Sequence, residues 1–259
     1  MLDAEGTVTP RRTTIGLLGS IDATIAADTH EWALPAWSRW PLLVLPIVAA
    51  GAVGLAAPHP RLYEALMSED RIVEWLQFVT ILLASGVFAL VARAAWRGDR
   101  RGLAALFALV AAAAFVVAGE EISWGQRILG LETPEVLDRI NHQGETNIHN
   151  IPLIQRMFNI GELLAGVYGF AIPILWWIPS IRARLAGRLD RLVVPPLALA
   201  TLFFLPFAYR AFRALFLPEA GERITQYGEL PELTLYLGTL IMGVALLGVL
   251  RRRASANPS

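Results

Sequence analysis

The chain has 259 residues, of which 55% are hydrophobic and 17% are charged, and its mean hydropathy is +0.51. Soluble domains of this length are seldom so apolar, and several apolar runs approach the roughly 20 residues that cross a bilayer as a helix. The absence of cysteine and of lysine excludes disulfides, thiolate metal sites, cysteine nucleophiles and Schiff-base lysines. The sequence therefore predicts an all-α, polytopic integral membrane protein.

The polar stretch 1–38 precedes the first apolar run and is predicted to form an N-terminal segment, in which residues 15–25 fit an amphipathic surface helix. Residues 39–250 are predicted to form the transmembrane domain, and residues 251–259 a C-terminal tail. Tryptophans before the first apolar run are interpreted as an aromatic belt at the membrane surface, namely Trp32, Trp37 and Trp40.

Six apolar runs are long enough to be spans, and they predict a bundle of six transmembrane helices. The predicted spans are residues 41–57, 72–92, 103–118, 161–178, 192–208 and 233–250. The third helix is expected to continue to Leu129. An interfacial helix-loop segment is expected between spans 3 and 4, because Thr133-Pro134-Glu135 combines a cap, a first-turn proline and an acid, which predicts a short helix over 134–141.

The arginines are distributed asymmetrically between the two ends of this bundle. The end that carries both termini has fourteen arginines and seven acids, and the other end has eight arginines and fifteen acids. Short loops rich in arginine stay in the cytoplasm. We therefore predict that both termini are cytoplasmic and that the acidic end is extracytoplasmic. The lack of lysine is typical of bacterial genomes rich in G and C, so the expected location is a cytoplasmic (inner) membrane.

The third span ends in two adjacent glutamates, Glu120 and Glu121. A charged group at or near membrane depth is costly, so such residues usually have a function. Side by side on a helix they point about 100° apart, and only one needs to face the interior. A general acid or base, or a metal ligand, is one interpretation. The other is an ion pair at a helix end, between Glu120 and Arg127.

The segment 141–150 reads NHQGETNIHN and supplies a second candidate set. If it is helical, Glu145 and His149 face the same way, as two ligands of one metal would, and Glu121 is a third candidate ligand. A divalent metal is then the candidate cofactor. The same residues also fit a hydrogen-bonded surface loop, because Asn, Gly and Thr favour turns.

Other polar residues gather at the same end of the predicted bundle. Gln155, Asn159 and Glu162 recur at i, i+4 and i+7, which places them on one helix face. The residues expected to bind substrate are Gln126, Arg127, Asn147, Asn150, Gln155, Asn159, Arg210 and Arg213. The expected supporting carboxylates are Glu74, Glu162, Glu229 and Glu232. The two late arginines could clamp a phosphate or carboxylate, or neutralise the surplus acids.

The end of the third span resembles the first motif of the CAAX-protease-like membrane endopeptidases, in which an apolar helix ends in Glu-Glu and an arginine follows about a turn later. Glu120, Glu121 and Arg127 carry the resemblance, over less than a tenth of the chain. In that family the paired glutamates activate water and histidines in later spans complete the site. In this chain the arginine comes two residues later than in the family's motif. No predicted span contains a histidine, since His142 and His149 lie in the loop.

Three functions from different classes fit the sequence. The first is a membrane enzyme, a hydrolase or transferase that acts on a lipid or lipid-linked substrate with Glu120, Glu121 and His149 as catalytic groups. The second is a cation-binding transporter or channel, which predicts carboxylates across the whole membrane. The third is an assembly or scaffold partner, which predicts an exposed polar cluster. The lipid bilayer is the expected surrounding, and no nucleic-acid partner is expected.

Overall fold

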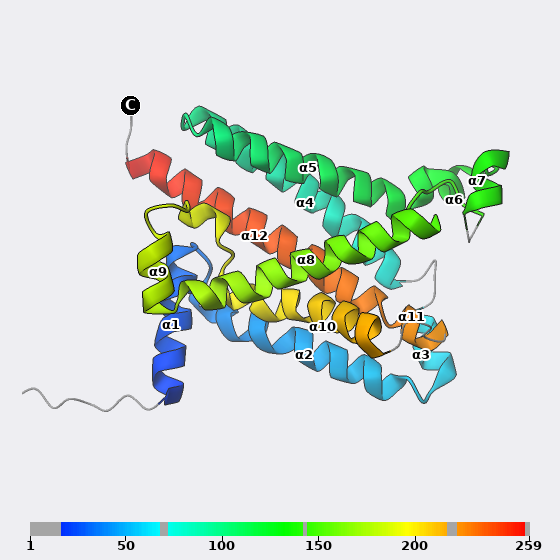
Figure 1. Ribbon diagram of the computed structural model, residues 1–259, viewed down its shortest axis with the longest axis horizontal. Coiled ribbons are helices and arrows are strands. Elements are labelled where there is room, and N and C mark those ends of the chain that lie inside the picture. The colour runs from blue at the N-terminus through cyan, green and yellow to red at the C-terminus, as the bar shows by residue number, and fades with distance from the viewer. Residues whose placement is uncertain (1–16, 68–71, 142–143, 217–221, 257–259) are drawn as a thin grey trace, which may run out of the picture.

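The computed structural model describes residues 17–67, 72–141, 144–216 and 222–256, and these residues form an all-α bundle (Figure 1). Six segments are long and apolar enough to cross a membrane, so the chain is a multi-pass membrane protein, as predicted. The long helices are α2 (Arg39–Ala56), α4 (Ile72–Arg97), α5 (Arg101–Glu121), α8 (Pro152–Trp176), α10 (Ala200–Phe216) and α12 (Glu229–Ala256).

Short helices connect or flank the long ones. They are α1 (Leu17–Glu31), η1 (Ala36–Ser38), α3 (Pro60–Met67), η2 (Ser123–Gly125), α6 (Gln126–Leu129), α7 (Glu135–Ile140), α9 (Pro179–Leu185), η3 (Arg191–Val193), η4 (Leu197–Leu199) and α11 (Glu222–Gln226). Helix α7 confirms the predicted interfacial helix, with Pro134 as the residue before its first turn. Helices α6 and α7 lie at the end of the bundle opposite the C-terminus (Figure 1).

The predicted continuation of the third span to Leu129 is wrong. Helix α5 ends at Glu121, and the chain then turns through three residues with positive φ, Ser123 (47°), Trp124 (55°) and Gly125 (80°). The left-handed region is unfavourable for residues with a Cβ, so this turn needs support from its surroundings. The chain after Glu121 therefore changes direction, and α6 does not continue the axis of α5.

Glycines let the central helices approach closely. Helix α4 packs between α5 and α12, while α10 packs against α8, α12 and α2. The ring of Phe203 on α10 occupies the space beside Gly169 of α8, where a Cβ would lie 2.0 Å from the ring, and beside Gly238 of α12, where it would lie 3.0 Å away. Aromatic and aliphatic side chains fill the middle of the bundle in this way.

A buried ion pair joins α1 to the bundle at the end that carries the C-terminus. Asp28 is 0% exposed, and it accepts hydrogen bonds from Arg191 (2.7 Å), from the indole of Trp177 (3.1 Å) and from the backbone N–H of Leu197 (2.6 Å). Burial raises the pKa of Asp28, against the effect of the guanidinium. Trp32 is 1% exposed and lies under that guanidinium, so its interpretation as a belt residue is wrong, whereas the other two belt tryptophans are exposed.

Candidate functional site

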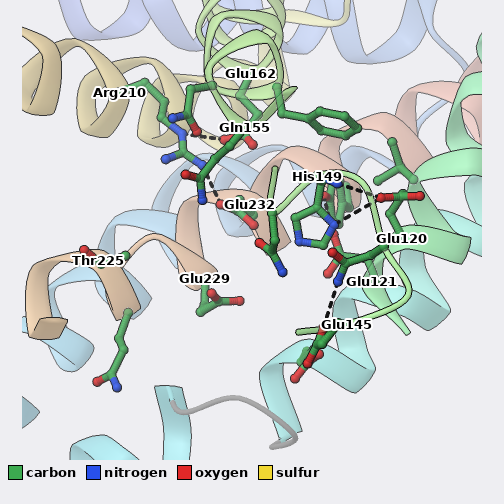
Figure 2. Close-up of a pocket in the computed structure, with 18 of the residues that line it drawn as sticks. Glu120, Glu121, Glu145, His149, Gln155, Glu162, Arg210, Thr225, Glu229 and Glu232 are labelled. Atoms are coloured by element: carbon green, nitrogen blue, oxygen red, sulfur yellow. Dashed lines mark hydrogen bonds and ion pairs between the residues drawn. The ribbon is translucent and has the colours of Figure 1, made fainter. Parts of the chain in front are cut away.

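A polar pocket of about 710 Å³ lies at the end of the bundle where α5 terminates, and Figure 2 shows side chains that line it. Its walls come from the beginnings of α4, α8 and α12, the ends of α5 and α10, α11, and the loop that follows α7. Among the predicted site residues with described side chains, all but Gln126 line it: Glu74, Glu120, Glu121, Glu145, Asn147, His149, Asn150, Gln155, Asn159, Glu162, Arg210, Arg213, Glu229 and Glu232. The pocket thus gathers predicted site residues that are up to 158 positions apart, from Glu74 to Glu232.

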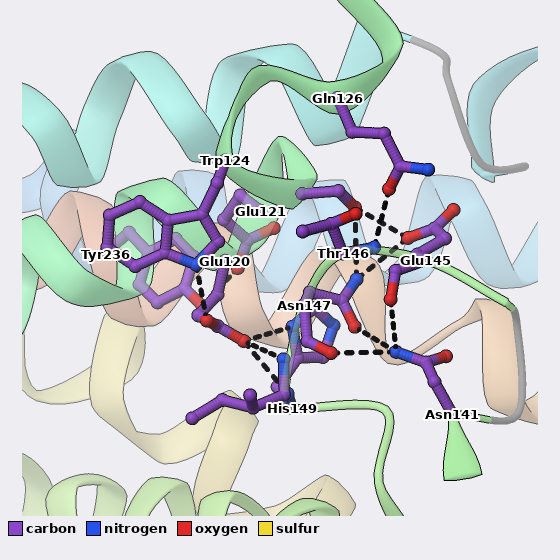
Figure 3. Close-up of polar contacts among 12 residues, drawn as sticks. Glu120, Glu121, Trp124, Gln126, Asn141, Glu145, Thr146, Asn147, His149 and Tyr236 are labelled. Atoms are coloured by element: carbon purple, nitrogen blue, oxygen red, sulfur yellow. Dashed lines mark hydrogen bonds and ion pairs between the residues drawn. The ribbon is translucent and has the colours of Figure 1, made fainter. Parts of the chain in front are cut away.

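Glu120 holds the loop that follows α7 (Figure 3). One carboxylate oxygen accepts a hydrogen bond from the indole of Trp124 (2.7 Å), and the other accepts from the backbone N–H groups of Ile148 (2.7 Å) and His149 (2.9 Å). The residue is 2% exposed. Hydrogen bonds to a charged acceptor are strong, so Glu120 acts chiefly as an anchor for the loop.

The left-handed turn after α5 completes this anchor. Trp124 folds back over Gly119, where a Cβ would lie 2.8 Å from the indole ring, so only glycine leaves room for it. In this position the indole N–H reaches Glu120, and the hydroxyl of Ser123 reaches Glu145. The sequence offered one sign of this turn, the glycine at 125, because glycine adopts positive φ at no steric cost.

Glu145 belongs to a hydrogen-bonded network within an irregular loop. Its Oε2 accepts from Ser123 Oγ and from Asn147 Nδ2, both at 2.7 Å, and Asn141 donates to Asn147 Oδ1 at 2.8 Å (Figure 3). The residues from 144 to 151 are not helical. The helical pairing expected for Glu145 and His149 is therefore wrong, and the alternative interpretation as a hydrogen-bonded loop is confirmed.

Gln126 is a predicted site residue whose described side chain does not line the pocket. The side chain of Gln126 donates to Thr133 and accepts from the backbone N–H of Thr146, so it braces the outer side of the loop. The side chain of Arg127 lies outside the described residues, as do His142 and Gln143. The proposed ion pair between Arg127 and Glu120 therefore remains a prediction.

The donor set offers no support for the predicted metal. Within the described ranges, no group of three or more His, Asp or Glu side chains is arranged to hold a metal ion. Of the three candidate ligands, Glu145 is engaged by Ser123 and Asn147, His149 lies against Glu120, and Glu121 accepts from Tyr236. These contacts supply hydrogen-bond donors to the two carboxylates. A buried carboxylate needs either such donors or a cation as its partner.

His149 projects from the loop against the anchor. Its Nδ1 lies 3.4 Å from Glu120 Oε2, and its side chain is 31% exposed. Burial opposes protonation, but the contact with Glu120 and the charges of Glu121, Glu120 and Glu145 raise the pKa of His149 above its ordinary value. These contacts therefore favour the imidazolium form more than in an isolated histidine, and the ring faces the pocket.

Glu121 is the one of the two adjacent glutamates that faces the pocket space with acceptor capacity left over. It is half-buried, and its Oε1 accepts a hydrogen bond of 2.7 Å from the phenol of Tyr236 on α12. Tyr236 is its hydrogen-bond donor among the described residues, whereas Glu120 has three. A carboxylate can accept about four hydrogen bonds, so Glu121 can bind a further group.

The two arginines of α10 have different surroundings. Arg210 is paired with Glu162 through Nε and with Glu232 through Nη2, both at 2.6 Å, which fits the predicted neutralisation of acids. Arg213 donates to the phenol oxygen of Tyr209 at 3.3 Å, and the described part of the chain gives it no carboxylate partner. Arg213 therefore brings a guanidinium with unused donors to the pocket wall.

The pocket carries an excess of acids and ends inside the bundle. Among the described residues, seven carboxylates line it, against two arginines and one histidine. The core beyond it is apolar, with Phe203, Leu202 and Leu246 each 3% exposed or less. Within the described spans no acid occurs between the pocket and the opposite helix ends. The site is thus a closed-ended pocket at one membrane face.

No family model matches the chain, and comparison with the curated proteins and the solved structures finds no match. The functional argument therefore depends on the geometry of the pocket. In that geometry Glu120 anchors a loop, whereas Glu121 faces the pocket. The resemblance to the membrane endopeptidases implied instead that the two glutamates act together.

Proposed function

We propose that this protein is an integral membrane enzyme, a hydrolase or transferase, that acts on a lipid or lipid-linked substrate in the pocket. The observation that carries the proposal is the convergence of Glu121 and His149 on one enclosed pocket at the membrane face. Acids and bases with unlike surroundings, placed together in a cleft, are typical of catalytic sites. The charge of Glu121 acts on His149, which supports their working as a pair.

In this mechanism Glu121 is the general base and His149 the general acid. An attacking water or hydroxyl oxygen loses its proton to the Glu121 carboxylate as it bonds to the substrate. The leaving oxygen takes a proton from the His149 imidazolium, so that no strong base is expelled. Tyr236 positions Glu121 through its hydrogen bond, and Glu120 positions His149 through the loop. Proton return from Glu121 to His149 restores both groups.

The place of the pocket supports a substrate from the membrane. The pocket lies at the ends of long apolar helices, where lipid headgroups meet the protein. The excess of arginine at the opposite end supports an extracytoplasmic pocket and cytoplasmic termini. We therefore assign the reaction to the outer leaflet of the cytoplasmic membrane.

The excess of carboxylates also favours a second candidate, a transporter or channel that binds cations. That function needs a polar path through the bundle, and the apolar core around Phe203 opposes it. An assembly partner would present its polar residues on an open surface, and here they line an enclosed space.

The test is turnover of lipids by the purified protein in nanodiscs made from a bacterial lipid extract, followed by mass spectrometry. We expect the wild type to convert a lipid class, and Glu121→Gln to lose activity by a factor of about 10² to 10⁴, the usual contribution of a general base. The control is Glu135→Gln on α7, whose side chain is 88% exposed and makes only a surface ion pair, and which should retain full activity.

Two results would overturn the proposal: no change in any lipid with the wild type, or equal rates for the wild type and Glu121→Gln. Cation flux through the same protein in sealed vesicles would then support the transporter.

A further inference from the structure

A second cavity adjoins the polar pocket. This groove of about 540 Å³ is lined by side chains from α2, α3, α10, α11 and α12, and its walls are almost entirely apolar. Leu205, Phe212 and Leu230 are among them. An apolar groove of this size fits a hydrocarbon chain, because a chain that lies in it buries apolar surface.

Tyr209 separates the groove from the polar pocket. Its ring lines the groove, and the guanidinium groups of Arg210 and Arg213 lie 5.2 and 5.9 Å from the ring centroid. Both arginines line the pocket. The phenol oxygen donates to the backbone carbonyl of Ile224 and receives the hydrogen bond from Arg213, so the wall is fixed in place. Tyr209 therefore lies between the apolar groove and the two arginines of the polar pocket.

Charges within the pocket change sign with distance from this wall. Arg213 is bonded to Tyr209 and has no carboxylate partner in the described part of the chain. Farther in, Arg210 is neutralised by its two glutamates, and beyond it Glu121 is bonded to Tyr236, one turn deeper on α12 than Glu232. An anion fits near the groove, and a cation fits deeper in the pocket.

We infer that the substrate is a zwitterionic phospholipid with a primary amine, bound with one acyl chain in the groove, its phosphate at Arg213 and its ammonium among the carboxylates. A guanidinium binds phosphate through paired donors. A primary ammonium offers three N–H donors to the acids deeper in the pocket, including Glu121, whereas a quaternary ammonium offers none. An anionic headgroup without an amine would meet the surplus of carboxylates. This inference rests on the proposed function, since it names the substrate of that site.

The test is lipid binding to the purified protein, measured by native mass spectrometry with phosphatidylethanolamine, phosphatidylcholine and phosphatidylglycerol that carry the same acyl chains. We expect phosphatidylethanolamine to bind at least about tenfold more tightly than either of the others, which corresponds to about 1.4 kcal/mol. Arg213→Gln should weaken phospholipid binding about tenfold or more and leave the binding of soluble ethanolamine unchanged, because ethanolamine has no phosphate.

The groove is tested by filling it. Ala208→Trp places a large side chain in the groove and should weaken the binding of phosphatidylethanolamine about tenfold or more, as should Ala57→Trp at another wall. The matched control is Leu55→Trp, at a position of α2 that is 79% exposed and does not line the groove, and which should bind as the wild type does. Using two groove variants guards against a fold defect in one of them.

Equal binding of the three phospholipids, or groove variants that bind like the control, would overturn the inference. The turnover assay distinguishes this from failure of the proposed function. Turnover that depends on Glu121 but does not prefer amine lipids would refute the substrate class alone. Selective binding of phosphatidylethanolamine without turnover would refute the enzyme and leave the lipid site in place.

Discussion

Replacement of Glu120 by glutamine tests whether this carboxylate holds the loop of residues 144–151. Glutamine keeps the shape but has one acceptor oxygen. If that oxygen keeps the bonds to the N–H groups of Ile148 and His149, the amide NH₂ meets the indole N–H of Trp124, donor against donor. The variant therefore loses one charge-assisted hydrogen bond outright and weakens two others.

The expected effect on loop opening is about 2–3 kcal/mol, since a buried group left without its partner costs about 1–3 kcal/mol and bonds to a charged acceptor are each stronger than neutral ones by about 1 kcal/mol. At about 1.36 kcal/mol per factor of ten, this predicts amide exchange that is roughly 30- to 150-fold faster at Ile148 and His149. Hydrogen exchange of the protein in nanodiscs, read by mass spectrometry, measures this. Glu135→Gln, whose ion pair is exposed, should change nothing there.

The same variant should lower the pKa of His149. Burial opposes protonation of this ring, and the contact with Glu120 is the largest effect that raises its pKa. Because the folded pKa is raised above the unfolded value, the stabilisation of the loop is complete below the unfolded pKa and is lost as pH rises through the folded pKa. Loop protection should thus fall with rising pH in the wild type, and less in Glu120→Gln. Exchange that is unaffected by the substitution would refute Glu120 as the anchor.

Two further substitutions test the packing at other places. Gly169→Ala puts a Cβ 2.0 Å from the ring of Phe203 and should destabilise the bundle by about 1–3 kcal/mol, whereas Gly161→Ala on the same helix meets nothing within 4 Å and should stabilise it by up to about 1 kcal/mol. Asp28→Asn leaves a buried arginine without its charge partner and should cost about 3–5 kcal/mol, against at most about 1 kcal/mol for the partly exposed Asp22→Asn. Thermal unfolding in one detergent measures all four, and equal shifts within either pair would contradict the reasoning.

The spans were predictable from sequence because a helix in a bilayer satisfies its own backbone, so length and hydropathy suffice. The break in the helix after Glu121 was not predictable from the sequence. It depends on a ring at Trp124 that fits over Gly119 and bonds to Glu120, and no local propensity requires this arrangement. The burial of Trp32 was missed for a similar reason, since its partner Arg191 lies far along the chain.

The composition of the pocket was predictable where helices carry it. Gln155, Asn159 and Glu162 share a face by spacing alone, and all three line the pocket. The direction of the loop residues was not predictable, because Glu145 and His149 are oriented by Ser123 and Glu120, more than 20 positions away. The apolar groove was not predictable from the sequence, because five helices each contribute only a few of its residues.

The acids at the two ends of the bundle have different surroundings, and this difference supports the pocket as the candidate functional site. Asp28 is enclosed, paired with Arg191 and bonded to further donors, as a structural ion pair must be to offset its desolvation. At the other end, the described carboxylates that line the pocket outnumber the described cations, and the pocket is only partly enclosed. Folding alone gains nothing from an excess of like charges, which repel one another. The proposed substrate would account for these acids, because its ammonium group supplies hydrogen-bond donors and positive charge.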